Sequence, residues 1–187
     1  MTDGRRVTRD RASVRTCGTI ALLPLGDIDL KEIQALAPTL GSTFERATFV
    51  AEAVALPQSA YHARRRQYVS TVLLDILDHE RRPEWDRVLG VVDVDLFAGH
   101  LNFVFGEADA HAGVAVTSLA RLHDADVAVF RRRAETEAIH ELGHTYGLGH
   151  CGDPRCVMWF SNTLVETDRK GTRFCAAHAC DLARILR

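Results

Sequence analysis

Long apolar runs are missing from the 187-residue chain, and none approaches the roughly 20 residues that cross a membrane as a helix. The first residues, MTDGRRVTRDRASVRTCG, carry charges but no apolar stretch followed by a cleavage site, so no secretory signal is indicated. We therefore expect a cytoplasmic protein that has no membrane as a partner.

A strong charge of either sign is missing as well. The 23 lysines and arginines are balanced by 25 acidic residues, and the net charge of −2 gives no support to nucleic acid as a partner. Lysine itself is scarce, since only Lys31 and Lys170 occur. No internal repeat or low-complexity tract is visible. A chain of this length with 47% hydrophobic residues can bury a proper core, so we expect a single catalytic domain or two lobes of one. The sequence does not specify the oligomeric state, and a monomer is the expectation.

One stretch, HELGHTYGLGHCGDPRCVM, begins at His140 and carries most of the chemistry. His140 and His144 are four residues apart, so on a helix both imidazoles lie on one face and can bind one zinc ion. Glu141, between them, can reach a zinc-bound water as a general base. Gly147 lets the chain leave the helix sharply, and the turn brings His150 back as a third ligand. Three protein ligands leave the fourth position open, which is typical of a catalytic zinc.

The segment after the motif is short and rich in cysteine. Only 37 residues follow His150, which is too few to form a stable lobe without a metal or disulfide. Four of the five cysteines lie here together with a histidine: Cys151, Cys156, Cys175, His178 and Cys180. Without a secretory signal, this clustering favours a zinc site with thiolate ligands, and disulfides are the alternative.

Upstream of the motif, apolar runs and alternation predict strands. They are expected at residues 19–25, within 44–56, and at 88–96, 101–105 and 113–119. Three closely spaced strands after two strand–helix units predict an α/β fold, with a mixed sheet, an antiparallel edge and backing helices.

Four helices are predicted from apolar spacing and end signals. They run from Asp29 to near Pro38, from Ser59 to Leu77, from a start between Val129 and Ala134 through the zinc motif, and over 176–187. The arginine triplet at 64–66 is expected on a solvated face of the second helix. We expect residues 1–16 to form a flexible leader, 17–150 an N-terminal α/β lobe and 151–187 a small zinc-stapled C-terminal lobe.

The run HELGHTYGLGHC, the CVM that follows it and the C-terminal cysteine group resemble the archaemetzincins, a metzincin-like family of zinc peptidases. The stretches DVDLFAGHLNFVFGEAD and AVTSLARL are similar to that family's strands before the active-site helix. The resemblance implies a metzincin-like fold, a catalytic zinc held by His140, His144 and His150, and Glu141 as general base. It also implies Met158 as the Met-turn residue beneath the metal, and a second, structural zinc held by four cysteines.

The chain departs from the family pattern at that second site. The family ends in Cys-x-x-Cys, whereas here Cys175 is followed at the matching position by His178, with Cys180 two residues further on. Either residue can complete a tetrahedral zinc site with Cys151 and Cys156. On the first turn of a helix, residue i+3 lies beside residue i, and this slightly favours His178.

These parts together predict a peptidase that binds two zinc ions and hydrolyses peptide bonds by a Glu-assisted zinc-bound water. Its partner would be a peptide or protein substrate. Phe103, Val104 and Phe105 are expected to form an upper edge strand that pairs with an extended peptide. Residues 157–160 are expected to form an apolar pocket wall. The alternative is a zinc-binding protein of the same fold with weak or no peptidase activity, acting by peptide or protein binding.

Overall fold

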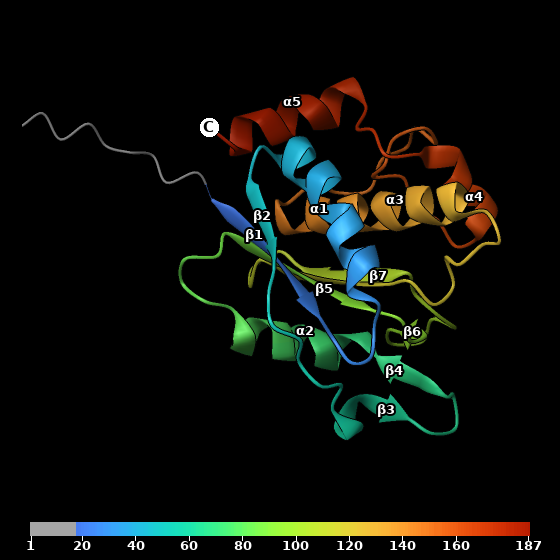
Figure 1. Cartoon of the computed structure of the whole chain (residues 1–187). Coiled ribbons are helices and arrows are strands. Elements are labelled where there is room, and N and C mark those ends of the chain that lie inside the picture. Colours follow the sequence, from blue (N-terminus) through green and yellow to red (C-terminus); the bar gives the residue numbers. More distant parts are fainter. Residues whose placement is uncertain (1–17) are drawn as a thin grey trace, which may run out of the picture.

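The computed structural model describes residues 18–187, and its centre is a five-stranded sheet with the order β2-β1-β5-β8-β7 (Figure 1). The strands are β1 (Thr19–Pro24), β2 (Ala47–Val50), β5 (Arg87–Val92), β7 (Gly106–Asp109) and β8 (Val114–Ser118). All neighbours pair in parallel except β7, which runs antiparallel to β8 at one edge. The predicted mixed α/β sheet with an antiparallel edge is confirmed. The predicted leader lies outside the described residues.

Helices cover both faces of this sheet (Figure 1). α1 (Leu30–Phe44) and α3 (Val127–Thr145) lie on one face, and α2 (Ser70–Glu80) lies on the other. Successive residues of β1 alternate between two apolar clusters: Ile20 and Leu22 pack with α1 and α3, whereas Ala21 and Leu23 pack with α2. Because both faces are covered, the strand is apolar throughout, and this explains its continuous hydrophobic run.

The C-terminal segment lies on the same side of the sheet as α1 and α3 (Figure 1). It contains α4 (Leu164–Lys170) and α5 (Ala176–Ile185). Val157, Met158 and Leu182 belong to the same apolar cluster as Leu142 of α3. The core of the upstream part of the chain therefore continues into this segment, and the division at residue 150 stays a prediction. Within residues 18–187, no helix combines the length and the apolar character needed to cross a membrane.

The helix predicted from Ser59 to Leu77 was wrong over its first half. Residues 58–60 form a short 3₁₀ turn, and a hairpin of β3 (Tyr61–His62) and β4 (Gln67–Val69) follows. β4 pairs with β6 (Leu96–Phe97) in a second, three-stranded sheet. The Tyr61 and Tyr68 rings pack across the hairpin, with centroids 5.1 Å apart. Cross-strand packing and pairing with a distant segment therefore outweigh the local helical pattern.

Three further elements differ from the prediction. α1 continues through Pro38, because Leu40 and Phe44 extend its buried stripe. α3 begins at Val127, before the predicted range, where the Asp126 side chain accepts a hydrogen bond from the Ala128 N–H and caps the helix. Residues 101–105 form no strand beyond an isolated bridge between Val104 and Leu96, and the edge strand is β7.

Candidate active site

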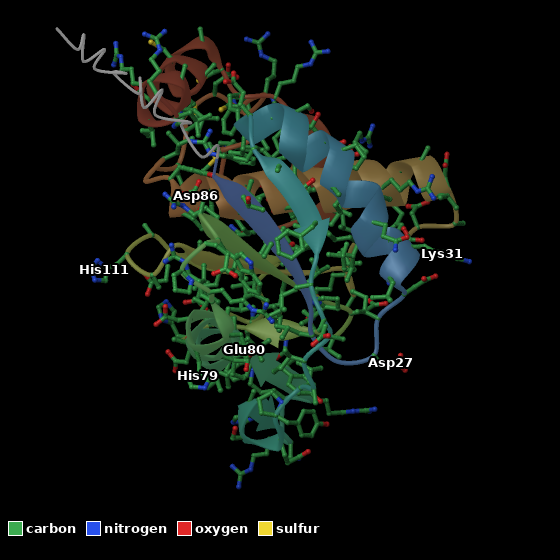
Figure 2. The ribbon with its side chains drawn as sticks, turned by 60° about the vertical axis from the view of Figure 1, so that its left-hand side comes forward. Asp27, Lys31, His79, Glu80, Asp86 and His111 are labelled. Atoms are coloured by element: carbon green, nitrogen blue, oxygen red, sulfur yellow. The ribbon has the colours of Figure 1, made fainter. Side chains whose placement is uncertain are left out.

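α3 presents three of the predicted site residues on one buried face. His140 and Glu141 are each 5% exposed, and His144 follows one turn later. The end of α3 is fixed to the sheet through Asp86, the residue directly before β5 (Figure 2), whose carboxylate accepts a hydrogen bond of 2.9 Å from the Tyr146 hydroxyl. Gly147 follows with φ +79°, a left-handed turn that leads the chain to His150.

The imidazoles of His140 and His144 face each other through their Nε2 atoms, which lie 3.1 Å apart. The Nδ1 atoms lie 2.7 Å from the Val157 carbonyl oxygen and 2.8 Å from that of Leu148. A carbonyl oxygen only accepts, so each Nδ1 must donate, and each neutral ring then turns an Nε2 lone pair toward the other. Two lone pairs held together in this way repel each other unless a cation lies between them.

His150 completes this group, and its ring centroid lies 4.8 Å from that of His144. One ligand atom from each of the three histidines lies within 4.8 Å of the others. Burial lowers the pKa of His140 well below its ordinary value, and the positive charge of Lys170 lowers it further. Burial also lowers the pKa of His144 and of His150. The neutral imidazole is the form that binds a metal, so the donor set fits zinc.

Glu141 lies on the same face of α3 and packs against β7. A Cβ atom at Gly106 would lie 2.5 Å from the Glu141 Cγ, so only glycine permits this approach. Burial raises the pKa of Glu141 well above its ordinary value, and the carboxylate of Glu137, one turn earlier, raises it further. A carboxyl group held beside a cavity can accept a proton from a bound water and release it again during a reaction.

Met158 is fully buried and packs in the apolar cluster that includes Leu142 of α3. Its Sδ atom would lie 2.5 Å from a Cβ atom at Gly143, the residue directly before His144. A larger side chain at 143 would therefore push Met158 away from the helix.

A cavity of about 300 Å³ opens in front of the histidines. One wall is apolar and includes Leu101, Phe103 and Val104, and the next is formed by Gly106, Glu107 and Ala108 of β7. The lining also includes three residues of the C-terminal segment: Phe160, Ser161 and Asn162. The expectation of an apolar wall at residues 157–160 was therefore wrong in part. Val157 and Met158 are buried under α3 instead, and the wall continues with polar residues.

A second donor group lies in the C-terminal segment. Cys151, Cys156, Cys175 and His178 each offer an atom within 4.8 Å of the others, whereas Cys180 is exposed and stands outside the group. The helix α5 begins directly after Cys175, so His178 lies on its first turn. His178 Nε2 lies 3.1 Å from the Gly149 carbonyl oxygen, so Nε2 donates and the Nδ1 lone pair faces the sulfur atoms.

The thiols of this group are free. The Sγ atoms of Cys151 and Cys175 lie 3.8 Å apart, well beyond a disulfide bond of about 2.05 Å. The backbone N–H of His178 lowers the pKa of the Cys175 thiol to about 6, while burial raises that of Cys156 to about 11. A cation shared by the group would favour the thiolate form of every cysteine in it.

Two residues beside the histidines were missed from the sequence. Glu137 lines the cavity, and its carboxylate pairs with Lys170, which is buried. Glu137 precedes Glu141 by four residues, so the two side chains lie on one face of a helix. This spacing could have indicated that Glu137 belongs to the site. Lys170 is one of only two lysines in the chain, but no local pattern linked it to the site.

Comparison with known proteins identifies the relatives of this chain. Residues 47–184 match peptidase family M54. The chain belongs to this family. An archaemetzincin from Methanopyrus kandleri is 51% identical over 120 residues, covering 64% of this chain and 68% of the relative. Another from Archaeoglobus fulgidus is 40% identical over 156 residues, covering 83% and 93%. The crystal structure of the Methanopyrus kandleri archaemetzincin matches with a TM-score of 0.85 and 37% identity, covering 94% of this chain and 98% of that one.

Membership of the M54 family confirms the resemblance drawn from the motif. It makes the chain a zinc metallopeptidase, whose substrates contain peptide bonds. The structural match confirms the predicted α/β fold as that of the archaemetzincins.

Proposed function

We propose that His140, His144 and His150 hold a catalytic zinc and that Glu141 is the general base of peptide hydrolysis. The observation that carries this is the pair of Nε2 atoms 3.1 Å apart, each with its Nδ1 committed to a backbone carbonyl. Two imidazole ligands of a tetrahedral zinc, each about 2.0–2.1 Å from the metal, stand roughly 3.3 Å apart. The observed spacing and the two Nδ1 hydrogen bonds support the assignment of both rings as ligands.

When bound, zinc polarises a carbonyl group and lowers the pKa of water, which is the chemistry that peptide hydrolysis needs. Glu141 accepts a proton from the attacking water at its carboxylate and later donates it to the leaving amine. Its burial and its contact with β7 hold it beside the cavity. Met158 acts as the Met-turn residue that supports α3 below the histidines.

The peptide binds along β7. This strand ends the five-stranded sheet, and Gly106, Glu107 and Ala108 line the cavity. A peptide can add to such an edge by main-chain hydrogen bonds. The role predicted for Phe103, Val104 and Phe105 changes accordingly, because these residues flank the bound peptide as an apolar wall rather than pair with it.

A second, structural zinc is held by Cys151, Cys156, Cys175 and His178. Four protein ligands close this site, in contrast to the open catalytic one. It joins the turn after α3 to the start of α5 and stabilises the C-terminal segment that carries these ligands.

Turnover on a mixed-sequence peptide library tests the proposed activity. The zinc-loaded protein is expected to cleave a subset of peptides, to lose this activity with a chelator and to regain it when zinc is added back. Matched variants His144→Ala and His111→Ala separate the site from nonspecific effects, since His111 is exposed and points away from the molecule (Figure 2). Cleavage that survives chelation, or is lost equally in both variants, would overturn the proposal.

A further inference from the structure

The arginine triplet at 64–66 occupies the hairpin between β3 and β4, not a helix face. Arg64 and Arg66 are exposed, but Arg65 is half-buried. Its guanidinium lies over the Phe97 ring, 4.2 Å from the centroid, and its Nη2 donates to the carbonyl oxygens of Leu101 at 2.7 Å and Asn102 at 2.9 Å. A single side chain thus binds both β6 and the segment that follows it.

Neighbouring polar groups extend these contacts into a hydrogen-bond network. Arg65 Nε donates to Gln67 Oε1 at 2.9 Å, and the buried Gln67 amide donates to the Asn102 carbonyl at 2.9 Å and to Asp95 at 3.0 Å. Asp95 in turn accepts two hydrogen bonds from Arg121, whose guanidinium lies over the Phe103 ring at 4.1 Å. Charge-assisted bonds of this kind are stronger than neutral ones, and they link into one network.

The segment that Arg65 contacts forms one wall of the candidate active site. Leu101, Phe103 and Val104 line the cavity, yet the segment has little regular structure, since its one strand contact is the bridge between Val104 and Leu96. Gly99, with φ +50°, adds a turn at its start. Without a ladder of backbone bonds, the shape of this wall depends on side-chain contacts, and Arg65 supplies two of them directly.

We propose that Arg65 is a positioning residue for peptide binding, which fixes the Leu101–Val104 wall through the carbonyl groups of Leu101 and Asn102. The proposal rests on the peptidase function given above. Arg65 lies in the turn between β3 and β4, whereas His140 and His144 lie on α3 and His150 follows it. Loss of Arg65 therefore changes how well a peptide is held rather than the chemistry. Removing a contact that serves ground state and transition state alike raises KM and leaves kcat unchanged.

The experiment compares Arg65→Ala and Arg65→Lys with Arg64→Ala, an exposed neighbour in the same hairpin. The probe is the peptide that the zinc-loaded wild type cleaves fastest from a mixed-sequence library. Arg65→Ala is expected to raise KM about tenfold with kcat within about twofold of wild type. Arg65→Lys should raise KM by less than Arg65→Ala does. An ammonium group can donate to one carbonyl group, but it cannot stack on the Phe97 ring or donate to two carbonyl groups from one plane as a guanidinium does. Arg64→Ala should match the wild type.

Hydrogen exchange gives a readout that needs no activity. Amides in residues 98–105 should exchange faster in Arg65→Ala than in wild type or Arg64→Ala, with zinc content unchanged. Equal exchange in all three proteins, or a fall in kcat with KM unchanged, would overturn the inference. If the wild type cleaves no peptide, the proposed activity fails. Faster exchange of residues 98–105 in Arg65→Ala would still support the role of Arg65 in fixing the Leu101–Val104 wall, and unchanged exchange would still refute it.

Discussion

The Nζ atom of Lys170 lies 3.2 Å from the carboxylate of Glu137, and neither side chain reaches solvent, with exposures of 0% and 2%. The hydroxyl of Thr167 also donates to this carboxylate, at 2.8 Å. The pair joins α4 to α3 one turn before Glu141. A buried ion pair is costly to break from one side, because the remaining charge is left without a partner in a medium that solvates it poorly.

Lys170→Met is therefore expected to lower the free energy of unfolding by about 3–5 kcal/mol, and Glu137→Gln by a similar amount. The double variant should regain most of the loss, because it leaves no unpaired charge. Urea unfolding of the four proteins measures this as a double-mutant cycle. Lys31→Met is the control, since Lys31 is exposed and extends into solvent at the edge of the molecule (Figure 2). Additive losses in the double variant would show that the two residues do not act as a pair.

Zinc analysis should give two ions per chain, and mutation should separate the two sites. His144→Ala is expected to lose one zinc and leave the fold intact, because the sheet and its helices keep their core. Cys156→Ala should lose the other and lower the unfolding midpoint, because metal binding stabilises the C-terminal segment. Mass spectrometry measures the zinc content of both variants, and thermal unfolding measures their stability. One zinc per wild-type chain, or unfolding caused by His144→Ala alone, would contradict this assignment.

His178→Ala should release the structural zinc faster than Cys180→Ser. His178 Nδ1 lies 3.2 Å from Cys175 Sγ, whereas Cys180 is exposed and outside the donor group. Zinc loss to a chromogenic chelator, compared between the two variants, decides between them. Faster release from Cys180→Ser would mean that α5 begins later in the zinc-bound protein.

Asp168 should stabilise the fold in a pH-dependent way. It accepts hydrogen bonds of 2.8 Å from both Nε and Nη2 of Arg133, and these lower the pKa of its carboxyl group. The stabilisation is then complete above the unfolded pKa of about 4 and is lost as the pH falls through the lower native pKa. Asp168→Asn should cost about 2 kcal/mol at pH 7.

Unfolding measured at several pH values checks this. The difference between wild type and Asp168→Asn should stay constant down to about pH 4 and narrow below it. Asp181→Asn is the control, because its pair with Arg184 is exposed and contributes little. A difference that is already small at pH 7 would refute the role given to Arg133.

Local rules predicted much of the site. The spacing of His140 and His144 on a helix and the left-handed turn at Gly147 follow from elementary geometry, and both are present. Cys175 to His178 is likewise an i+3 relation that the helix start fixes. The sheet followed from apolar runs such as that of β1, since a strand buried on both faces must be apolar throughout.

Relations between distant segments could not be predicted in this way. The hairpin at 61–69 depends on pairing of Tyr68 with Leu96, and α1 passes Pro38 because its later residues pack on other elements. The pairing of Lys170 with Glu137 and the contacts of Arg65 join residues more than 30 positions apart. No periodic pattern encodes such contacts, because they depend on how the elements pack.

Glu141→Gln tests the central claim most directly, since the amide keeps the size of a side chain that packs against Gly106 but cannot accept the proton. Zinc content and hydrolysis of the best library peptide are measured on the same preparation. The variant is expected to retain both zinc ions and to lose hydrolysis by a factor of about 10² to 10⁴. Hydrolysis close to the wild-type rate, with zinc retained, would contradict the assignment of Glu141 as general base.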